Sequence, residues 1–235
     1  MVEQIQQELQ AFIEPEKAEF LPKFFKTGAG EYAEGDVFLG VRVPWQRKVA
    51  RKYFQHVGLE DIKALLSSPV HEYRSVALII LVHKYEKAKY EEEKEKIAQF
   101  YLDNLDHVNN WDLVDLSADK ILGAYLFDKD RQPLLELAAS QDLWRQRVAM
   151  IATFYFIRKG DFADTLALAE LFLDHPHHLI HKAVGWMLRE VGKRDQQVEI
   201  AFLKEHYKRM PRTMLRYAIE KLEPQLRQEF LKGLV

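Results

Sequence analysis

The sequence predicts an all-α protein built from stacked helical hairpins, and three observations lead to this fold class. From about residue 55 onward, apolar residues recur at spacings of three and four, as they do on one face of an amphipathic helix. No stretch shows the alternation of a half-buried strand. Helix-breaking residues follow at short intervals, so that the segments between them are one or two helices long: Gly58, Pro69, Gly123, Pro133, Gly160, Pro176, Gly192, Pro211 and Pro224.

The third observation is a repeat. Five similar segments begin 37, 36, 35 and 34 residues apart, each with a large polar or aromatic residue before small and branched apolar ones. A period in this range is typical of HEAT or TPR arrays, whose hairpins bury their apolar faces only by stacking. The sequence therefore predicts one domain over 1–235, a right-handed solenoid of HEAT-like repeats with a concave groove. The leading residues of the segments are Arg74, Trp111, Arg147, Lys182 and Arg216.

Residues 1–55 fit the repeat less well, and we expect them to form an N-terminal cap. Within them, the stretch 27–42 holds four glycines around Tyr32, Val37 and Phe38, which predicts a loop or short hairpin. A phosphate-binding glycine loop is the alternative. It is disfavoured because no Lys-Ser/Thr pair follows the glycines and no strand precedes them.

Composition excludes several classes of function. Cysteine is absent, which excludes disulfides, thiolate zinc sites and thiol nucleophiles. The longest apolar run, 76–82, is too short to span a bilayer, and the N-terminus is too polar for a signal peptide, so we expect a cytoplasmic protein. The 34 Lys and Arg nearly balance the 36 Asp and Glu. A basic surface, if present, must therefore be local.

Four of the five leading residues are cationic, and Arg212 lies close to the last of them. In a stacked array, equivalent positions line up on one surface, and a row of cations would follow the phosphates of a DNA backbone. The alternative is that these side chains cap helices or pair with glutamates on solvated faces. Recurrence at one repeat position favours DNA binding over helix capping or pairing with glutamates.

The exception in the row is Trp111, which shares a helix face with Asp115 one turn later. An indole and a carboxylate among cations suit a ligand that is locally positive. A second indole, Trp186, follows Gly185, which would permit a close approach to that helix. The ordinary alternative is that Trp111 fills the core, that Asp112 or Asp115 caps a helix, and that Trp186 packs inside the fold.

With these residues in view, the chain resembles a known family. The motifs NNWDLVD (109–115), LWRQRVA (143–149) and HKAVGWMLREVGK (181–193), with PEKAE (15–19) and FLGVRVP (38–44), resemble the AlkD-like DNA alkylation repair proteins, which are HEAT-like-repeat DNA glycosylases. The resemblance extends over nearly the whole chain. It implies a monomeric enzyme that needs no cofactor and hydrolyses the glycosidic bond of N3- or N7-alkylated purines in duplex DNA, without deep base flipping.

The resemblance also implies roles for single residues. Asp115 is the essential carboxylate, Trp111 and Trp186 contact the deoxyribose, and Arg147 holds a phosphate. Two departures favour an alternative, a non-catalytic paralogue that binds branched or junction DNA: Phe24 stands where the glycosylases have a DNA-contacting tyrosine, and the glycine-rich stretch 28–37 is inserted before FLGVRVP. The candidate site residues are thus Asp115, Trp111 and Trp186 for catalysis, and Arg147, Arg74, Lys182, Arg212, Arg216 and Phe24 for DNA binding.

Four histidines surround Pro176 and suggest a metal site. No HExxH motif or fixed carboxylate accompanies them, so we interpret them as part of a loop and helix start, and expect no metal. The histidines are His175, His177, His178 and His181.

Overall fold

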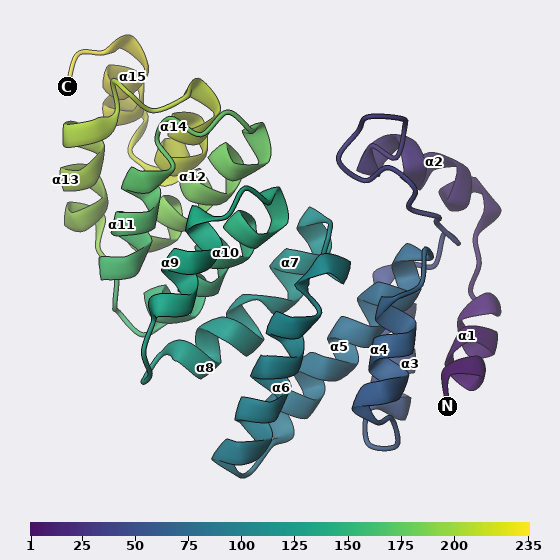
Figure 1. Ribbon diagram of the computed structural model, residues 1–235. Coiled ribbons are helices and arrows are strands. Elements are labelled where there is room, and N and C mark those ends of the chain that lie inside the picture. The colour runs from purple at the N-terminus through teal and green to yellow at the C-terminus, as the bar shows by residue number, and fades with distance from the viewer. The chain divides into compact units, whose positions relative to one another are not determined.

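A computed structural model describes residues 1–235 and confirms the predicted all-α fold class (Figure 1). There is no β-strand. A single isolated bridge joins Val37 to Val70 in parallel orientation. The helices form two compact units, residues 1–121 and 122–235, and each is described by itself. The prediction of one continuous domain stays a prediction.

In the first unit, α5 is the central helix and contacts α3, α4, α6 and α7. Its middle is buried on every side, which accounts for the apolar run 76–82 in the sequence. No helix of the chain has the length and apolar character needed to cross a membrane. The unit contains α1 (Val2–Gln10), α2 (Pro15–Phe25), α3 (Val43–Tyr53), α4 (Leu59–Leu66), α5 (His71–Lys87), α6 (Glu91–Asp103), the 3-10 turn η1 (Leu105–His107) and α7 (Trp111–Ser117).

In the second unit, α12 is central and packs on α10, α11, α13 and α14. Along the chain, the boundary between the two units falls within a π-helical turn, η2 (Asp119–Gly123). The unit contains α8 (Ala124–Leu126), α9 (Gln132–Ala139), α10 (Leu143–Arg158), α11 (Ala163–Leu171), α12 (His178–Gly192), α13 (Gln196–His206), α14 (Arg212–Ala218), the 3-10 turn η3 (Ile219–Lys221) and α15 (Pro224–Lys232).

The predicted repeat corresponds to a regular position in the fold. Each of the five leading residues lies within the first five residues of its helix, on α5, α7, α10, α12 or α14. Within the units these helices are neighbours, since α5 packs on α7, α10 on α12, and α12 on α14. Alternate helices of the chain therefore pack side by side in each unit, while the solenoid with its concave groove stays a prediction.

Two glycines explain how closely the helices approach. A Cβ atom at Gly185 would lie 2.4 Å from the carbonyl oxygen of Met214, so this glycine lets α14 pack directly on α12. The sequence pattern suggested a close approach at Gly185, and the approaching element is a neighbouring helix. At Gly123 a Cβ would lie 2.1 Å from the carbonyl oxygen of Ala152 on α10.

The glycine-rich stretch 27–42 is a loop and forms no hairpin. Its first part bends through turns at Gly30 and Gly35, both with positive φ angles. Its second part is tightly held, because Gly40, at φ +83°, lies so near α2 that a Cβ would be 2.3 Å from the carbonyl oxygen of Glu14. Only glycine satisfies both constraints.

A buried carboxyl group marks the packing of α13 on α12. Glu199 is 3% exposed, and its Oε1 has no hydrogen-bond partner. A Cβ at Gly192 would collide with this carboxyl group. The Glu199 side chain therefore occupies space that is free only because residue 192 is glycine. Burial raises the pKa of Glu199 to about 8, against a weaker opposing effect of Arg189. The group is therefore protonated in the folded protein at neutral pH.

This gives a pH-dependent stability of known sign. Because Glu199 ionises more readily in the unfolded chain, the free energy of unfolding should fall as pH rises from about 4.5 to about 8. Glu199→Gln removes this dependence, and we expect the variant to be more stable than wild type at pH 8.5 by a few kcal/mol and similar to it at pH 5. Urea unfolding at both pH values measures this.

The control is Glu136→Gln, which changes an exposed carboxylate on α9 of the same unit. It should follow the wild-type pH dependence. If the free energy of unfolding of Glu199→Gln differed from wild type by the same amount at both pH values, the buried acid would not be the source of the pH dependence.

Candidate nucleic-acid interface and catalytic carboxylate

Helix α7 presents the predicted indole and carboxylate on its partly exposed face. The helix begins after Asn110, whose side-chain oxygen accepts a hydrogen bond from the Trp111 backbone N–H at 2.8 Å. Leu113 and Val114 point into the core. Trp111 and Asp115, one turn apart, are both half-buried, so part of each side chain is accessible to solvent.

Trp111 ends a stack of four rings. Its indole stacks on Phe25 with centroids 5.2 Å apart and an interplanar angle of 12°. Phe25 stacks on Phe38 at 4.9 Å, and Phe38 stacks on His71 at 4.5 Å. The rings come from α7, α2, the glycine-rich loop and α5. The position of Trp111 therefore depends on three other segments of the first unit.

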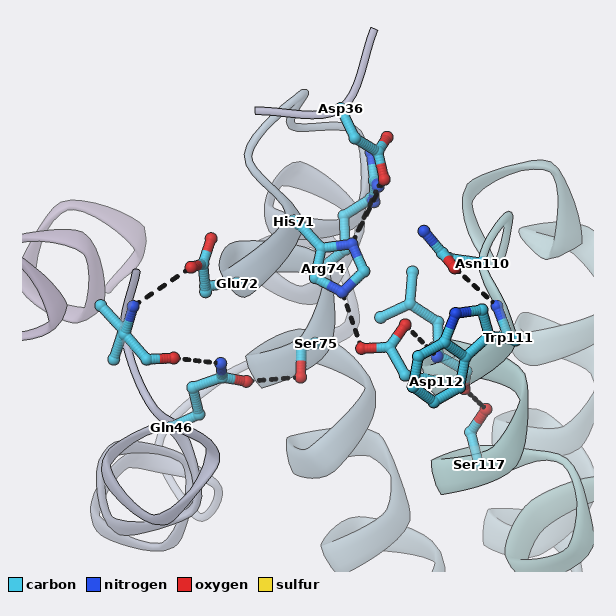
Figure 2. A network of polar contacts seen from close by, with 12 residues as sticks. Asp36, Gln46, His71, Glu72, Arg74, Ser75, Asn110, Trp111, Asp112 and Ser117 are labelled. Atoms are coloured by element: carbon cyan, nitrogen blue, oxygen red, sulfur yellow. Dashed lines mark hydrogen bonds and ion pairs between the residues drawn. The ribbon is translucent and has the colours of Figure 1, made fainter. Parts of the chain in front are cut away.

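The last ring of the stack belongs to a buried charge network of Asp36, His71, Arg74 and Asp112 (Figure 2). His71 Nε2 lies 2.8 Å from the Asp112 carboxylate, and its Nδ1 lies 3.2 Å from Asp36. Arg74 pairs with the same Asp36 oxygen at 2.5 Å. His71, Arg74 and Asp36 are buried, and Asp112 is partly exposed.

The network holds His71 as a cation. Burial alone would lower its pKa, but the nearby charge of Asp112 and hydrogen bonds to both carboxylates outweigh this and raise the pKa to about 9. Burial likewise opposes ionisation of Asp36, yet hydrogen bonds from His71 and Arg74 keep its pKa below the ordinary value. A cationic imidazole against the faces of Phe38 and Phe25 adds cation–π attraction to the stack.

The next residue, Glu72, anchors the end of the glycine-rich loop. It is 1% exposed, and its carboxylate accepts backbone N–H bonds from Leu39, Gly40 and Val41 at 3.0, 2.8 and 3.2 Å. Next to it, Ser75 donates to Gln46, which in turn donates to the Val41 carbonyl (Figure 2). The first turn of α5 thereby fixes the loop, on which α2 rests.

Helix α2 in turn carries two exposed aromatic rings, one of which adjoins Trp111. Phe20 is 58% exposed and Phe24 51%, and their rings lie 5.9 Å apart. The edge of Phe24 meets the indole of Trp111 at 6.0 Å. The predicted DNA contact Phe24 is thus at the surface and adjoins the predicted catalytic indole.

Below α7, Tyr101 hydrogen-bonds to Ser117 at 3.0 Å. Burial raises the pKa of Tyr101, and the negative charges of Asp119 and Asp115 raise it further. The phenol is therefore neutral and acts as a structural support of α7. The π-helical turn that begins at Asp119 follows directly, and such turns are frequent at functional sites.

In the second unit, Trp186 is also half-buried, and its position is also fixed by contacts with neighbouring side chains. Its ring lies 5.7 Å from Phe154, and its Nε1 donates to Glu190 at 3.3 Å. Burial favours the neutral form of Glu190, but hydrogen bonds from Lys193 and Arg194 keep its pKa below the ordinary value. A buried carboxylate thus anchors this indole.

The predicted cationic row divides into two kinds of side chain. Arg74 and Arg147 are each 4% exposed and bonded within the fold: Arg74 to Asp36, and Arg147 to the Leu179 carbonyl at 2.6 Å, which ties α10 to α12. Lys182 is half-buried, whereas Arg212 and Arg216 are exposed. The buried pair lacks the open surface expected of a row of phosphate contacts. DNA binding by any of the five stays a prediction.

The histidine group near Pro176 is part of a helix start, as expected from its sequence. His177 caps α12 by accepting from the Leu179 N–H at 3.2 Å, and His175 contacts Gln146 at 2.9 Å. Burial and the neighbouring histidines lower the pKa of His177 to about 4. No group of three or more acidic, histidine or cysteine side chains in the chain is arranged to hold a metal ion.

Sequence reasoning missed His71, Asp36, Phe25 and Phe38, although they determine where Trp111 lies. Their partners are far along the chain, and no local pattern marks them. It also missed the cations of α3, which a count of basic residues without acidic neighbours would have found at 47–52.

This is an all-α protein whose first unit presents a partly exposed indole and a carboxylate on one helix face, and whose second unit presents a further partly exposed indole. The chain belongs to the DNA alkylation repair enzyme family, whose sequence profile matches residues 5–222. The family resemblance seen in the motifs is thereby confirmed.

A solved structure described as a predicted DNA alkylation repair enzyme from Enterococcus faecalis shares the fold. The two superpose with a TM-score of 0.68 at 19% sequence identity, over 90% of this chain and 97% of the other. No protein with a curated description matches the chain.

The charge network predicts a second pH dependence. Because the folded protein raises the pKa of His71 from 6.5 to about 9, this residue should stabilise the fold fully below pH 6.5 and progressively less as pH rises through 9. His71→Gln should lower the free energy of unfolding at pH 6.5 by on the order of 3 kcal/mol more than at pH 9.5. Denaturant unfolding across this range measures the difference.

His56→Gln is the control, since His56 is an exposed histidine of the same unit. It should leave stability nearly unchanged at all pH values. A constant deficit of His71→Gln from pH 6.5 to 9.5 would contradict a cationic His71.

Proposed function

We propose that this protein is a DNA glycosylase that hydrolyses the N-glycosidic bond of cationic N3- and N7-alkylated purines in duplex DNA. The observation that carries the proposal is on α7. There the Trp111 indole and the Asp115 carboxylate share one partly exposed face. Membership of the DNA alkylation repair enzyme family supports it.

The chemistry requires stabilisation of positive charge. An alkylated purine is already cationic, so its glycosidic bond is weakened, and cleavage develops oxocarbenium character at the sugar. Asp115 would stabilise this charge and orient a water molecule toward the anomeric carbon. The water oxygen bonds to that carbon and gives up a proton to the surrounding solvent, while the glycosidic electron pair leaves with the base, which departs neutral.

Trp111 would contribute an aromatic face to the cationic sugar, and its rigid support suits this role. Stacked on Phe25 and bordered by Phe24, the indole has little freedom to turn, so contact with the sugar would cost little conformational entropy. From the family resemblance we further expect Trp186 to contact deoxyribose and Arg147 a phosphate.

The decisive substitution is Asp115→Asn. We expect release of N7-methylguanine from duplex DNA, counted as abasic sites in single turnovers, to fall by at least about 100-fold, because the carboxylate charge is lost. Affinity for undamaged duplex should stay within a few-fold, since the amide has the same shape.

The matched control is Asp103→Asn, an exposed carboxylate on α6 of the same unit, which should retain full activity. Wild-type release no faster than spontaneous loss, at stoichiometric protein, would refute the glycosylase. Full activity of Asp115→Asn would remove this residue from the mechanism.

A second candidate is a non-catalytic protein that binds branched DNA, and the exposed rings of Phe20 and Phe24 favour it. At a junction, unstacked bases are available to aromatic side chains. We expect this candidate to bind a four-way junction at least about 10-fold more tightly than linear duplex at equal salt, with Phe20→Ala/Phe24→Ala removing the preference. Equal affinity of wild type for both DNAs would count against it.

A further inference from the structure

Helix α3 carries a concentration of positive charge that the cationic row does not include. Its exposed face holds Arg47, Lys48, Arg51 and Lys52, here called the α3 strip, and the helix contains no acidic residue. The opposite face, with Gln46, Val49 and Ala50, is buried. In a chain whose net charge is −2, four cations within two helical turns are a strong local excess.

Most of this charge is not neutralised within the protein. Lys52 pairs with Glu8 at 2.5 Å, and Lys48 lies over the stacked rings of Phe12 and Trp45, 5.0 Å from the Trp45 centroid. Arg47 and Arg51 form no ion pair or hydrogen bond with any side chain. Cations near the end of a helix complement its dipole, which accounts for Arg51 and Lys52 but not for Arg47 and Lys48 in its middle.

The strip borders one shallow, open hollow along the exposed face of α3. This hollow has a volume of about 490 Å³, and apart from Pro44 its lining consists of the four strip residues. Mutual repulsion of like charges around one hollow is unfavourable in the free protein. Binding of a polyanion would relieve it, and each contact with a phosphate would release a condensed counterion.

Arg47 also borders a second, smaller hollow of about 60 Å³ that leads from α3 toward α7. Its lining includes His83 of α5, Lys120, and Leu116, the neighbour of Asp115. One acidic residue, Glu86, lies there too and faces His83 at 3.6 Å. The hollow thus connects the α3 strip, across α5, with α7, the helix that carries Trp111 and Asp115, and Lys120 adds one further cation to its lining.

We infer that the α3 strip is a binding site for the phosphate backbone of duplex DNA, on the side of the first unit that leads to α7. The inference rests on the proposed function, since it assigns the flank of the duplex whose lesion would lie at α7. Arg47 and Arg51, one helical turn apart, would contact successive phosphates of one strand, and Lys48 would approach the same strand from beside them.

The test is the salt dependence of binding to an undamaged duplex, measured by fluorescence anisotropy at several NaCl concentrations. For Arg47→Ala/Lys48→Ala/Arg51→Ala, the slope of log affinity against log salt should decrease in magnitude by about 2 to 3, which corresponds to roughly 0.9 for each lost phosphate contact. Arg47→Lys/Arg51→Lys, which keeps the charge, should retain most of the slope.

The matched control removes the same net charge elsewhere. Lys204→Ala/Lys208→Ala/Lys232→Ala changes three exposed lysines of the second unit and should leave the slope within about 0.5 of wild type. Thermal unfolding confirms that each variant is folded. Because none of the three control lysines is in the proposed catalytic site or in the α3 strip, single-turnover excision by the control variant at saturating protein should change less than about twofold.

The outcomes separate the two proposals. If wild type excises N7-methylguanine but the α3 variant keeps its slope, or the control variant loses as much, the strip is not a phosphate site and the glycosylase stands. If the slope falls as expected but no excision occurs, the strip stands and the glycosylase fails. A wild type without salt-dependent affinity for duplex overturns the inference about the strip, and the excision assay still decides the glycosylase separately.

Discussion

The first unit depends on the burial of charge at the first turn of α5. His71, Glu72 and Arg74 are all less than 5% exposed, and a buried charge is tolerable only when it is paired and hydrogen-bonded. The partners come from outside α5: Asp36 and three backbone N–H groups from the loop, and Asp112 from α7. Loss of Asp36 would leave Arg74 buried without its carboxylate, and loss of Asp112 would leave His71 with one carboxylate in place of two. This requirement, together with apolar contact, gives the loop and α7 a defined position.

The defined position of the loop and α7 also fixes the side chains of the candidate site. Trp111 is stacked on rings that rest on cationic His71, while Asp112 beside it is bonded to the same histidine. The second unit supports Trp186 in a comparable way, with one aromatic neighbour and one anchoring carboxylate. A rigid indole can present its face without reorganisation, which is what electrostatic preorganisation requires.

Local patterns predicted the helices well because periodicity and breakers act over one or two turns. The 34–37-residue spacing likewise located α5, α7, α10, α12 and α14, since the equivalent residues lie within the first five residues of each helix. What the pattern did not give was the direction of a side chain. Arg74 and Lys182 occupy the same repeat position. Arg74 is nevertheless buried and paired with a carboxylate 38 residues earlier in the chain, whereas Lys182 is half-buried. Such pairing is a long-range property, and the same is true of the stack beneath Trp111.

The two halves of the glycine-rich loop differ in how firmly they are held. From Asp36 onward, every residue to Val41 is buried, bonded or packed against α2, whereas a Cβ at Gly30 or Gly35 would meet nothing within 4 Å. The turns at Gly30 and Gly35 are therefore open to solvent, although Ala33 between them is buried. A fluorophore or an affinity peptide placed at either turn should report on the protein while leaving the anchored base and the ring stack in place.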